Sequence, residues 1–188
     1  MEIKVLCIGC GRSGTKYFSK QFKNFGLSVG HEKGRLNGES NWMKTNLIFN
    51  KETKKLKQYT DIFHIIRNPI HQISSSSTIG KLAWEKIGKC ISISKNDSEI
   101  IRSMKWWYYW NYKISKNPNY IDYILHIENF YEDIKPFLDK YKIKTYKKIH
   151  SLVNTRKHKN LTPKDLKIAD KELYLKIIDL SSLYGYDI

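Results

Sequence analysis

Residues 3–16 read IKVLCIGCGRSGTK, and they carry the clearest indication of the fold class. Its first part, Ile3–Ile8, is an almost continuous apolar run, which is typical of a strand buried on both faces of a parallel sheet. Glycines follow at positions 9, 11 and 14. Beyond them, a helix is indicated by aromatic residues at helical spacing, Phe18, Phe22 and Phe25. The pattern predicts a strand, a glycine-rich loop and a helix.

The rest of the chain repeats this alternation. Short strands are predicted at 27–29, 61–66 and 120–127, and helices from Pro69, over 98–116, over 130–141 and after Thr162. Strands that alternate with helices predict an α/β fold with a central parallel sheet flanked by helices. A length of 188 residues without repeats or a long linker suits one domain over residues 1–188.

Composition narrows the class of protein. The formal net charge is +16, which suits an anionic ligand or nucleic acid, but 29 of the 34 basic residues are lysines spread over the whole chain. Most of these lysines are therefore expected on a solvated surface. No apolar run approaches the roughly 20 residues of a membrane span, so we expect a soluble, cytoplasmic protein. Cys7 and Cys10 lack a second ligand pair, and we expect no metal site.

The glycine loop points to an anion. Glycines let the backbone turn tightly, and the loop N–H groups together with the start of a helix attract a phosphate. The alternative is a tight turn that binds nothing. Gly9 and Gly14 keep the spacing of the NTPase loop G-x-x-x-x-G-K-[ST], but Thr15 comes before Lys16. An acidic residue for Mg²⁺ follows only the later strand, at Glu128, so an NTPase or kinase remains a weaker alternative.

The loop resembles the 5′-phosphosulfate loop of the sulfotransferase family, in which a basic residue precedes Ser-Gly-Thr. Arginine at that place is similar to the protein-tyrosine sulfotransferases, whereas cytosolic members usually have lysine. The resemblance implies a P-loop three-layer sandwich and the donor 3′-phosphoadenosine 5′-phosphosulfate (PAPS). It assigns the 5′ end of the donor to Gly11, Arg12, Ser13, Gly14, Thr15 and Lys16.

Two further segments resemble the family's 3′-phosphate site. Arg67-Asn68-Pro69, with Ser75 eight residues after the arginine, is similar to the motif R-[DN]-P-x-x-x-x-x-S. Arginine at a strand end can form two parallel hydrogen bonds to a phosphate, and a serine two turns into the next helix can donate a hydroxyl hydrogen bond to the same phosphate. Arg156 lies in a basic stretch that resembles the family's late closing loop without its glycine. The alternatives are a helix opened by proline and a solvated charge run.

The resemblance implies in-line transfer of a sulfuryl group to an acceptor hydroxyl on a sugar, lipid, small alcohol or tyrosine, without metal. Arg12 and Lys16 would stabilise the developing charge. The base is expected to be Glu32 or His31. Glu32 is favoured, because in the arginine-type branch the base is a glutamate about twenty residues past the loop; it could instead only pair with a nearby cation. A non-catalytic nucleic-acid binder is the remaining rival, and we expect no nucleic-acid partner.

Aromatic residues crowd the helix predicted over 98–116. One face carries Met104, Trp107, Trp110 and Ile114, a spacing that favours core packing. Trp106 or Tyr109, on another face, could stack on an acceptor. His64 and His126 lie within predicted strands and are expected to be core residues, and His71 lies in the first turn after Pro69 without an assigned role.

Overall fold

The computed structural model describes residues 2–144 and 157–188. The chain divides into two compact units. The first unit comprises residues 1–66 and 117–155, and the second comprises residues 67–116 and 156–188. The single domain predicted over residues 1–188 stays a prediction, and each unit is described by itself below.

The first unit contains a five-stranded sheet in which all paired strands are parallel. The order of the strands is β2-β3-β1-β4-β5. In the centre, Leu6 of β1 lies between Glu39 of β3 and Ile62 of β4. The strands are β1 (Val5–Ile8), β2 (Gly30–His31), β3 (Gly38–Ser40), β4 (Asp61–Ile66) and β5 (Tyr123–His126). The α/β class and the parallel sheet predicted from the sequence are confirmed.

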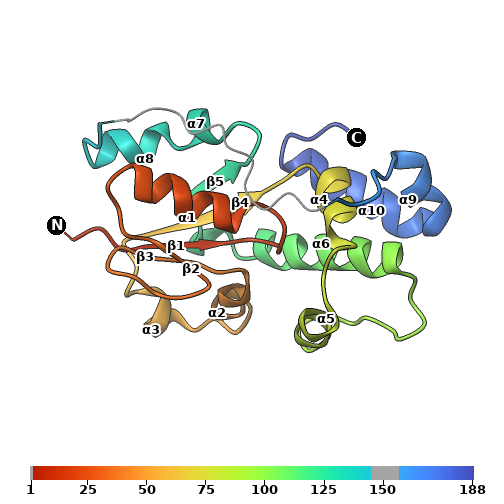
Figure 1. The fold of residues 1–188 in the computed structure, drawn as a ribbon. Helices are drawn as coiled ribbons and strands as arrows, with labels where there is room; N and C mark the ends of the chain where they lie inside the picture. Colours follow the sequence, from red (N-terminus) through yellow and green to blue (C-terminus); the bar gives the residue numbers. More distant parts are fainter. Residues whose placement is uncertain (1, 145–156) are drawn as a thin grey trace. The chain divides into compact units, whose positions relative to one another are not determined.

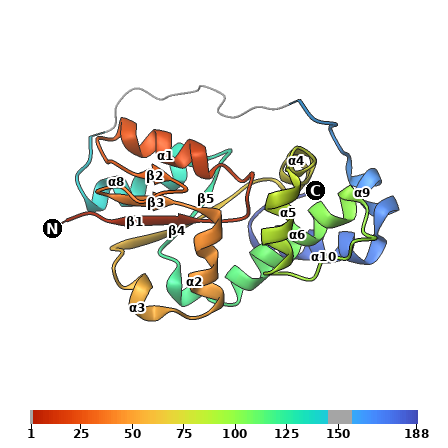
Figure 2. The same cartoon turned by 60° about the horizontal axis from the view of Figure 1, so that its bottom comes forward.

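Helices cover both faces of this sheet (Figures 1 and 2). One face packs against α1 (Thr15–Asn24), α7 (Phe130–Asp133) and α8 (Lys135–Lys140). The other face carries η1 (Trp42–Lys44), α2 (Thr45–Phe49) and α3 (Thr53–Leu56). Because side chains alternate along a strand, Val5 and Cys7 join the core beneath α1. Leu6 and Ile8 are equally buried, which explains why β1 is apolar throughout.

The sequence misplaced or missed several elements of the first unit. The strand predicted at 27–29 lies instead at Gly30–His31, and β3 was not predicted at all. The last strand is shorter than predicted, since η2 (Pro118–Tyr120) precedes it. The helix predicted over 130–141 is divided into α7 and α8. Strand β4 and the loop-to-helix step into α1 agree with the prediction.

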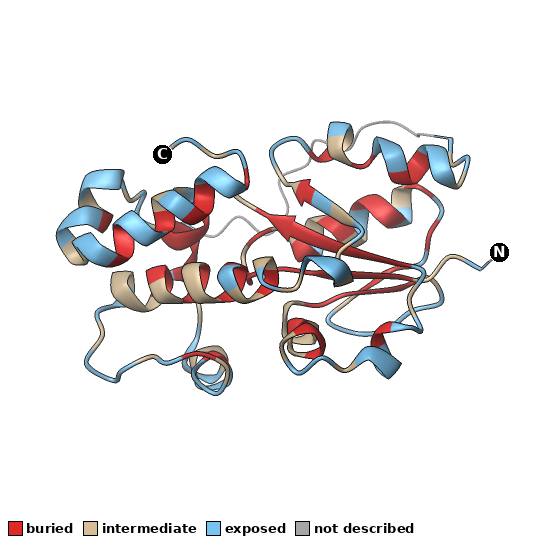
Figure 3. Cartoon of the chain, turned by 180° about the vertical axis from the view of Figure 1, so that it is seen from behind, coloured by how far each residue is buried: buried red, intermediate tan, exposed pale blue. Residues whose placement is uncertain are grey.

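The second unit is helical in its described part. Its helices are α4 (Pro69–Ser76), α5 (Lys81–Gly88), α6 (Glu99–Ser115), α9 (Pro163–Ala169) and α10 (Lys171–Leu183). Figure 3 shows buried residues along one side of its long helices. The face predicted for α6 is buried, and Leu173, Ile177 and Leu180 form a buried face of α10. The amphipathic pattern therefore identified the contribution of α6 to the core correctly.

Of the two residues of α6 offered as alternatives for stacking, the structure excludes one. Trp106 is only 1% exposed and packs edge-on against Trp84 and Trp110, so it belongs to the core and cannot stack on an acceptor. Tyr109 is partly exposed and contacts Tyr108. Because the rings that surround Trp106 are large and apolar, its indole is buried away from solvent.

Capping residues begin two helices where the sequence predicts it. Asn68 accepts hydrogen bonds from the backbone N–H groups of Ile70 and His71, with Pro69 in the first turn of α4. Thr162 and Asp165 form a reciprocal capping box at the start of α9. No helix among the described residues has the length and apolarity needed to cross a membrane.

Candidate functional site

The glycine loop lies where the sheet reverses its order of strands. Strand β1 is flanked by β3 on one side and β4 on the other. After β1 the chain builds β2 and β3 on one side, and it later builds β4 and β5 on the other. Open parallel sheets bind ligands in the crevice outside the carboxyl ends of the strands at such a point. Residues 9–14, which join β1 to α1, occupy this place.

The backbone of the loop requires its first and last glycines. A Cβ atom on Gly9 would lie 2.3 Å from the carbonyl oxygen of Ile65. Gly14 has φ of +108°, and its Cβ would lie 2.2 Å from Cδ1 of Ile127. Arg12 also has a left-handed backbone, with φ of +69°, which is uncommon for a residue with a side chain. The loop therefore bends tightly against β4 and against the residue after β5.

Ser13 provides a polar group that needs a partner. Its backbone N–H donates to the carbonyl of Cys10 at 3.2 Å. Its hydroxyl Oγ is fully buried and forms no hydrogen bond to any described residue. Buried hydroxyls in folded proteins almost always have a partner, and Gly14, the N-cap residue of α1, provides no side-chain cap. An oxyanion in the loop would accept from both the hydroxyl and the helix N–H groups.

Two cations belong to the loop. The side chain of Arg12 is partly exposed and that of Lys16 is exposed. Lys16 is near enough to contribute to the lowered pKa of His31. The loop thus combines donor groups of the backbone, a buried hydroxyl and positive charge.

His31, at the end of β2, contacts the beginning of α1. Its Nε2 lies 3.4 Å from Oγ1 of Thr15. Burial lowers the pKa of the half-buried imidazole, with Lys16 acting in the same direction and Glu32 opposing it. Burial therefore favours the neutral form of His31. The structure brings this predicted residue to the first residue of α1, directly after the loop.

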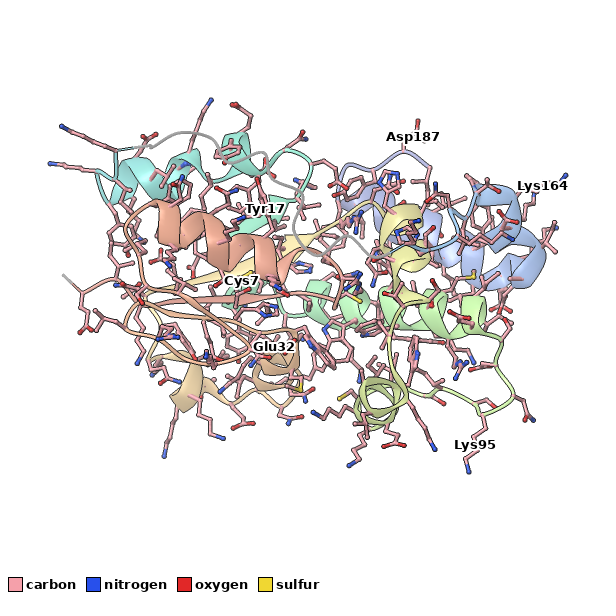
Figure 4. All side chains as sticks on the ribbon, in the orientation of Figure 1. Cys7, Tyr17, Glu32, Lys95, Lys164 and Asp187 are labelled. Carbon is pink, nitrogen blue, oxygen red and sulfur yellow. The ribbon has the colours of Figure 1, made fainter. Side chains whose placement is uncertain are left out.

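Glu32 is exposed and is held by an indole. Its backbone has φ of +57°, and its N–H donates to the carbonyl of Ser40 at 2.9 Å. Oε1 of Glu32 accepts a hydrogen bond of 3.1 Å from Nε1 of Trp42. Figure 4 shows Glu32 where the chain leaves β2, near the start of α2. The carboxylate is thus restrained while it remains accessible to solvent.

The end of β3 supplies polar residues that sequence reasoning missed. Ser40 donates from Oγ to the carbonyl of Thr15 at 2.8 Å. Asn41 donates from its backbone N–H to the carbonyl of Cys7 at 2.8 Å and caps η1 through Met43. The two residues therefore tie the end of β3 to β1 and to α1, the elements that the loop joins. The signal available in the sequence was Asn41, a helix-capping residue three positions after a glycine.

Glu39 is a second carboxylate near this edge, and it is fully satisfied. It is 6% exposed and accepts from the hydroxyl of Tyr59 at 2.9 Å and from Nδ2 of Asn41 at 3.2 Å. Nζ of Lys44 lies 3.4 Å from it. Burial, followed by this carboxylate, raises the pKa of Tyr59. Glu39 is a structural anion because its partners already occupy its oxygens.

In the second unit, Arg67 lines a pocket. It follows the last residue of β4 directly and precedes the cap of α4. The pocket has a volume of about 410 Å³, and its lining is Arg67, Ile70, His71, Ser74, His158, Asn160 and Leu161. Oγ of Ser74 accepts from the backbone N–H of Leu161 at 2.9 Å, which fixes the 157–162 segment on α4.

Ser75 is not among the residues that line this pocket. It is 3% exposed, and Ser74 takes its place in the pocket lining. The assignment of Ser75 to a phosphate stays a prediction. Arg156 lies outside the described residues.

The remaining predicted residues are structural. His64 is buried, and Nδ1 of His126 lies 2.8 Å from Oδ2 of Asp133. Cys7 and Cys10 are buried, and burial raises the pKa of both thiols, so both stay protonated. Among residues 2–144 and 157–188, no group of three or more His, Cys, Asp or Glu side chains could hold a metal ion.

Comparison with known proteins adds no relative. No protein-family model matches the chain, and no curated protein matches it significantly. Its function is therefore argued from the site itself.

Proposed function

We propose that the protein is a sulfotransferase that moves the sulfuryl group of PAPS to an acceptor hydroxyl. The observation that carries the proposal is the loop after β1, where the buried hydroxyl of Ser13 lacks a partner among the described residues. This hydroxyl and the uncapped start of α1 fit an oxyanion. The order Arg12-Ser13-Gly14-Thr15 resembles the sulfotransferase loop, and this resemblance favours a phosphosulfate over a nucleoside triphosphate; the proposed fold is a P-loop three-layer sandwich.

Charge placement supports the chemistry. In sulfuryl transfer the acceptor oxygen attacks sulfur in line, the bond from sulfur to the bridging oxygen breaks, and the leaving phosphate gains negative charge. Arg12 and Lys16 flank the loop and would stabilise that charge with the N–H groups of α1. The reaction then depends on positioning and on fixed positive groups.

The acceptor hydroxyl must lose a proton, and Glu32 is the proposed base. Its carboxylate is accessible and is oriented by the indole of Trp42. His31 contacts Thr15 and is the alternative base. A base must come within hydrogen-bonding reach of the acceptor, and an accessible carboxylate restrained by Trp42 can meet this condition.

The assignment of the 3′-phosphate to Arg67, Ser75 and Arg156 rests on the sequence resemblance. Arg67 lines a pocket with donor groups, which suits a phosphate. The acceptor class includes sugars, lipids, small alcohols and tyrosine.

A thermal-shift screen tests the proposal. Adenosine 3′,5′-bisphosphate without Mg²⁺ should raise the unfolding temperature, because a ligand at 100 times its Kd stabilises the folded state by about 2.7 kcal/mol. Stabilisation by ATP with Mg²⁺ alone would indicate a kinase or NTPase. A preference for oligonucleotides, lost steeply with salt, would indicate a nucleic-acid binder.

The two cations of the loop should act mainly on turnover. We expect Arg12→Ala and Lys16→Ala each to lower kcat about ten- to a hundredfold, since a charged hydrogen bond is worth roughly 1.5–3 kcal/mol and the charge is largest in the transition state. Steady-state kinetics with labelled PAPS measures the effect. Lys23→Ala, which removes an exposed lysine in the last turn of the same helix, is the matched control. A raised KM with unchanged kcat would show that the cations bind only the ground state.

A further inference from the structure

The pocket of the second unit contains two histidines that the proposed function does not use. His71 comes from the first turn of α4, and His158 comes from the segment before α9. The chain brings both to the pocket of Arg67, although they are far apart in the sequence. No acidic side chain is among the seven residues that line this pocket. A guanidinium and two imidazoles are a lining suited to an oxyanion.

The hydrogen bond of His158 fixes which of its nitrogens holds the proton. Nδ1 of His158 lies 3.1 Å from the carbonyl oxygen of Lys159. A carbonyl oxygen can only accept, so Nδ1 is the donor. In the neutral imidazole, Nε2 is then a lone-pair acceptor and repels an anion. Nε2 becomes a donor only when the ring takes up a second proton.

His71 is placed differently. Its ring is exposed, and its backbone N–H is held by the cap residue Asn68 at 3.4 Å. A neutral imidazole whose tautomer is not fixed by such a bond can present an N–H to an anion. His71 can therefore donate in either charge state, whereas His158 requires protonation.

We propose that this pocket binds a phosphate monoester, with Arg67 as the permanent cation and His158 as a ligand that takes up a proton when the anion binds. Affinity then rises as the pH falls through the range in which histidine titrates, around 6.5. The identity of the ester as the donor's 3′-phosphate rests on the proposed function, whereas the coupling to a proton rests on the pocket alone.

The charged neighbours of His158 support this direction. Lys157 and Lys159 precede and follow it, and both are exposed. Arg67 and His71 are the titratable or charged groups that α4 contributes to the pocket. Asp165 of α9 is the nearest acidic residue along the chain, and its carboxylate accepts from the backbone and hydroxyl of Thr162. These cations leave the region of the pocket positively charged, which favours the binding of an oxyanion.

Calorimetric titration of the full chain with adenosine 3′-phosphate tests the coupling. Experiments at pH 7 in buffers of different ionisation enthalpy should reveal net uptake of protons. The affinity should fall about tenfold or more from pH 6.5 to 8.5, because the uptake of one proton gives at most tenfold per pH unit. The affinity for sulfate should fall in the same way with rising pH. Because the charge of sulfate is constant in this range, that result would show that the pH dependence does not come from titration of the phosphate.

Three variants locate the effect. His158→Gln keeps a neutral donor and should abolish both the proton uptake and the pH dependence. His71→Gln is the same change at the other histidine and should preserve both. Arg67→Ala should weaken binding of adenosine 3′-phosphate tenfold or more, with less effect on adenosine 5′-phosphosulfate, which lacks a 3′-phosphate.

The outcomes separate this inference from the proposed function. Binding that is independent of pH in the unchanged protein, or a pH dependence that survives His158→Gln, would overturn the inference even if sulfuryl transfer is observed. Proton-coupled binding without sulfuryl transfer to any acceptor would support the inference and count against the proposed function. If Arg67→Ala weakened the binding of both nucleotides equally, the 3′-phosphate would not be bound in this pocket.

Discussion

Replacing Glu32 by glutamine should lower kcat by about 10²–10⁴-fold and leave the affinity for the donor nearly unchanged, because a general base contributes a factor of this size. Glutamine keeps the shape of the side chain and can still accept from the indole of Trp42, whose Nε1 lies 3.1 Å from Oε1. The proton acceptor alone is lost. Single-turnover measurements with bound donor separate this step from binding.

Two companion variants make the result specific. Trp42→Phe keeps an aromatic ring but removes the N–H that restrains Glu32, so kcat should fall by about tenfold, the value of one hydrogen bond to a charged group. His31→Asn should cost less than Glu32→Gln, since His31 contacts Thr15 and is assigned a supporting role.

The pH dependence of kcat distinguishes the two candidate bases. Burial lowers the pKa of His31, so a His31 base would lose activity as the pH falls through a value below about 6.5. With Glu32 as the base, the profile should lack this histidine limb. If Glu32→Gln retains most of its activity while His31→Asn abolishes it, the roles are reversed.

The sequence predicted those parts of the fold in which local pattern and tertiary environment agree. Strand β4 is largely apolar because both of its faces are buried. The pattern of apolar residues in a sequence is its clearest indication of which residues are buried. The starts of α4 and α9 were predicted from Pro69 and Thr162, and the bonds that cap these helices, from Asn68 and Thr162, are local. The glycine loop was placed correctly between β1 and α1 for the same reason.

Strand β3 could not be predicted, because its stability comes from other parts of the chain. Its three residues, Gly38–Ser40, are buried but none is apolar. A glycine is required at position 38 because β1 lies too close for a side chain. Glu39 can be buried because Tyr59, Asn41 and Lys44 contact its carboxylate. Each of these reasons is a contact with a residue elsewhere, and a strand of small or charged residues lacks the usual β-forming signal.

The candidate site was predictable to a similar extent. The loop residues follow β1 directly, so their position at the carboxyl end of that strand follows from chain order. The pairing of Trp42 with Glu32 and the meeting of His158 with Arg67 depend on folding of distant segments. The unpartnered hydroxyl of Ser13 is likewise a property of packing that composition cannot reveal.

Gly38→Ala should destabilise the folded chain by about 3 kcal/mol or more, with strain and overlap both contributing. Gly38 has φ of +110°, and a Cβ atom there would lie 1.8 Å from the carbonyl oxygen of Val5. That oxygen belongs to β1, whose residue Val5 is the register partner of Gly38. The backbone of β1 cannot retreat, because β4 pairs with its other edge. Urea denaturation followed by circular dichroism measures the change.

Two other glycines separate the causes of that loss. Gly26 has φ of +82° with no atom within 4 Å of its ideal Cβ, so Gly26→Ala should cost about 1 kcal/mol through backbone strain alone. Gly34 has open space and no positive φ, and its change to alanine should be nearly neutral. A Gly38→Ala protein as stable as the Gly26→Ala protein would contradict the close packing of β3 on β1. Because β3 holds Ser40 against Thr15, loss of this pairing should also weaken anion binding by the loop.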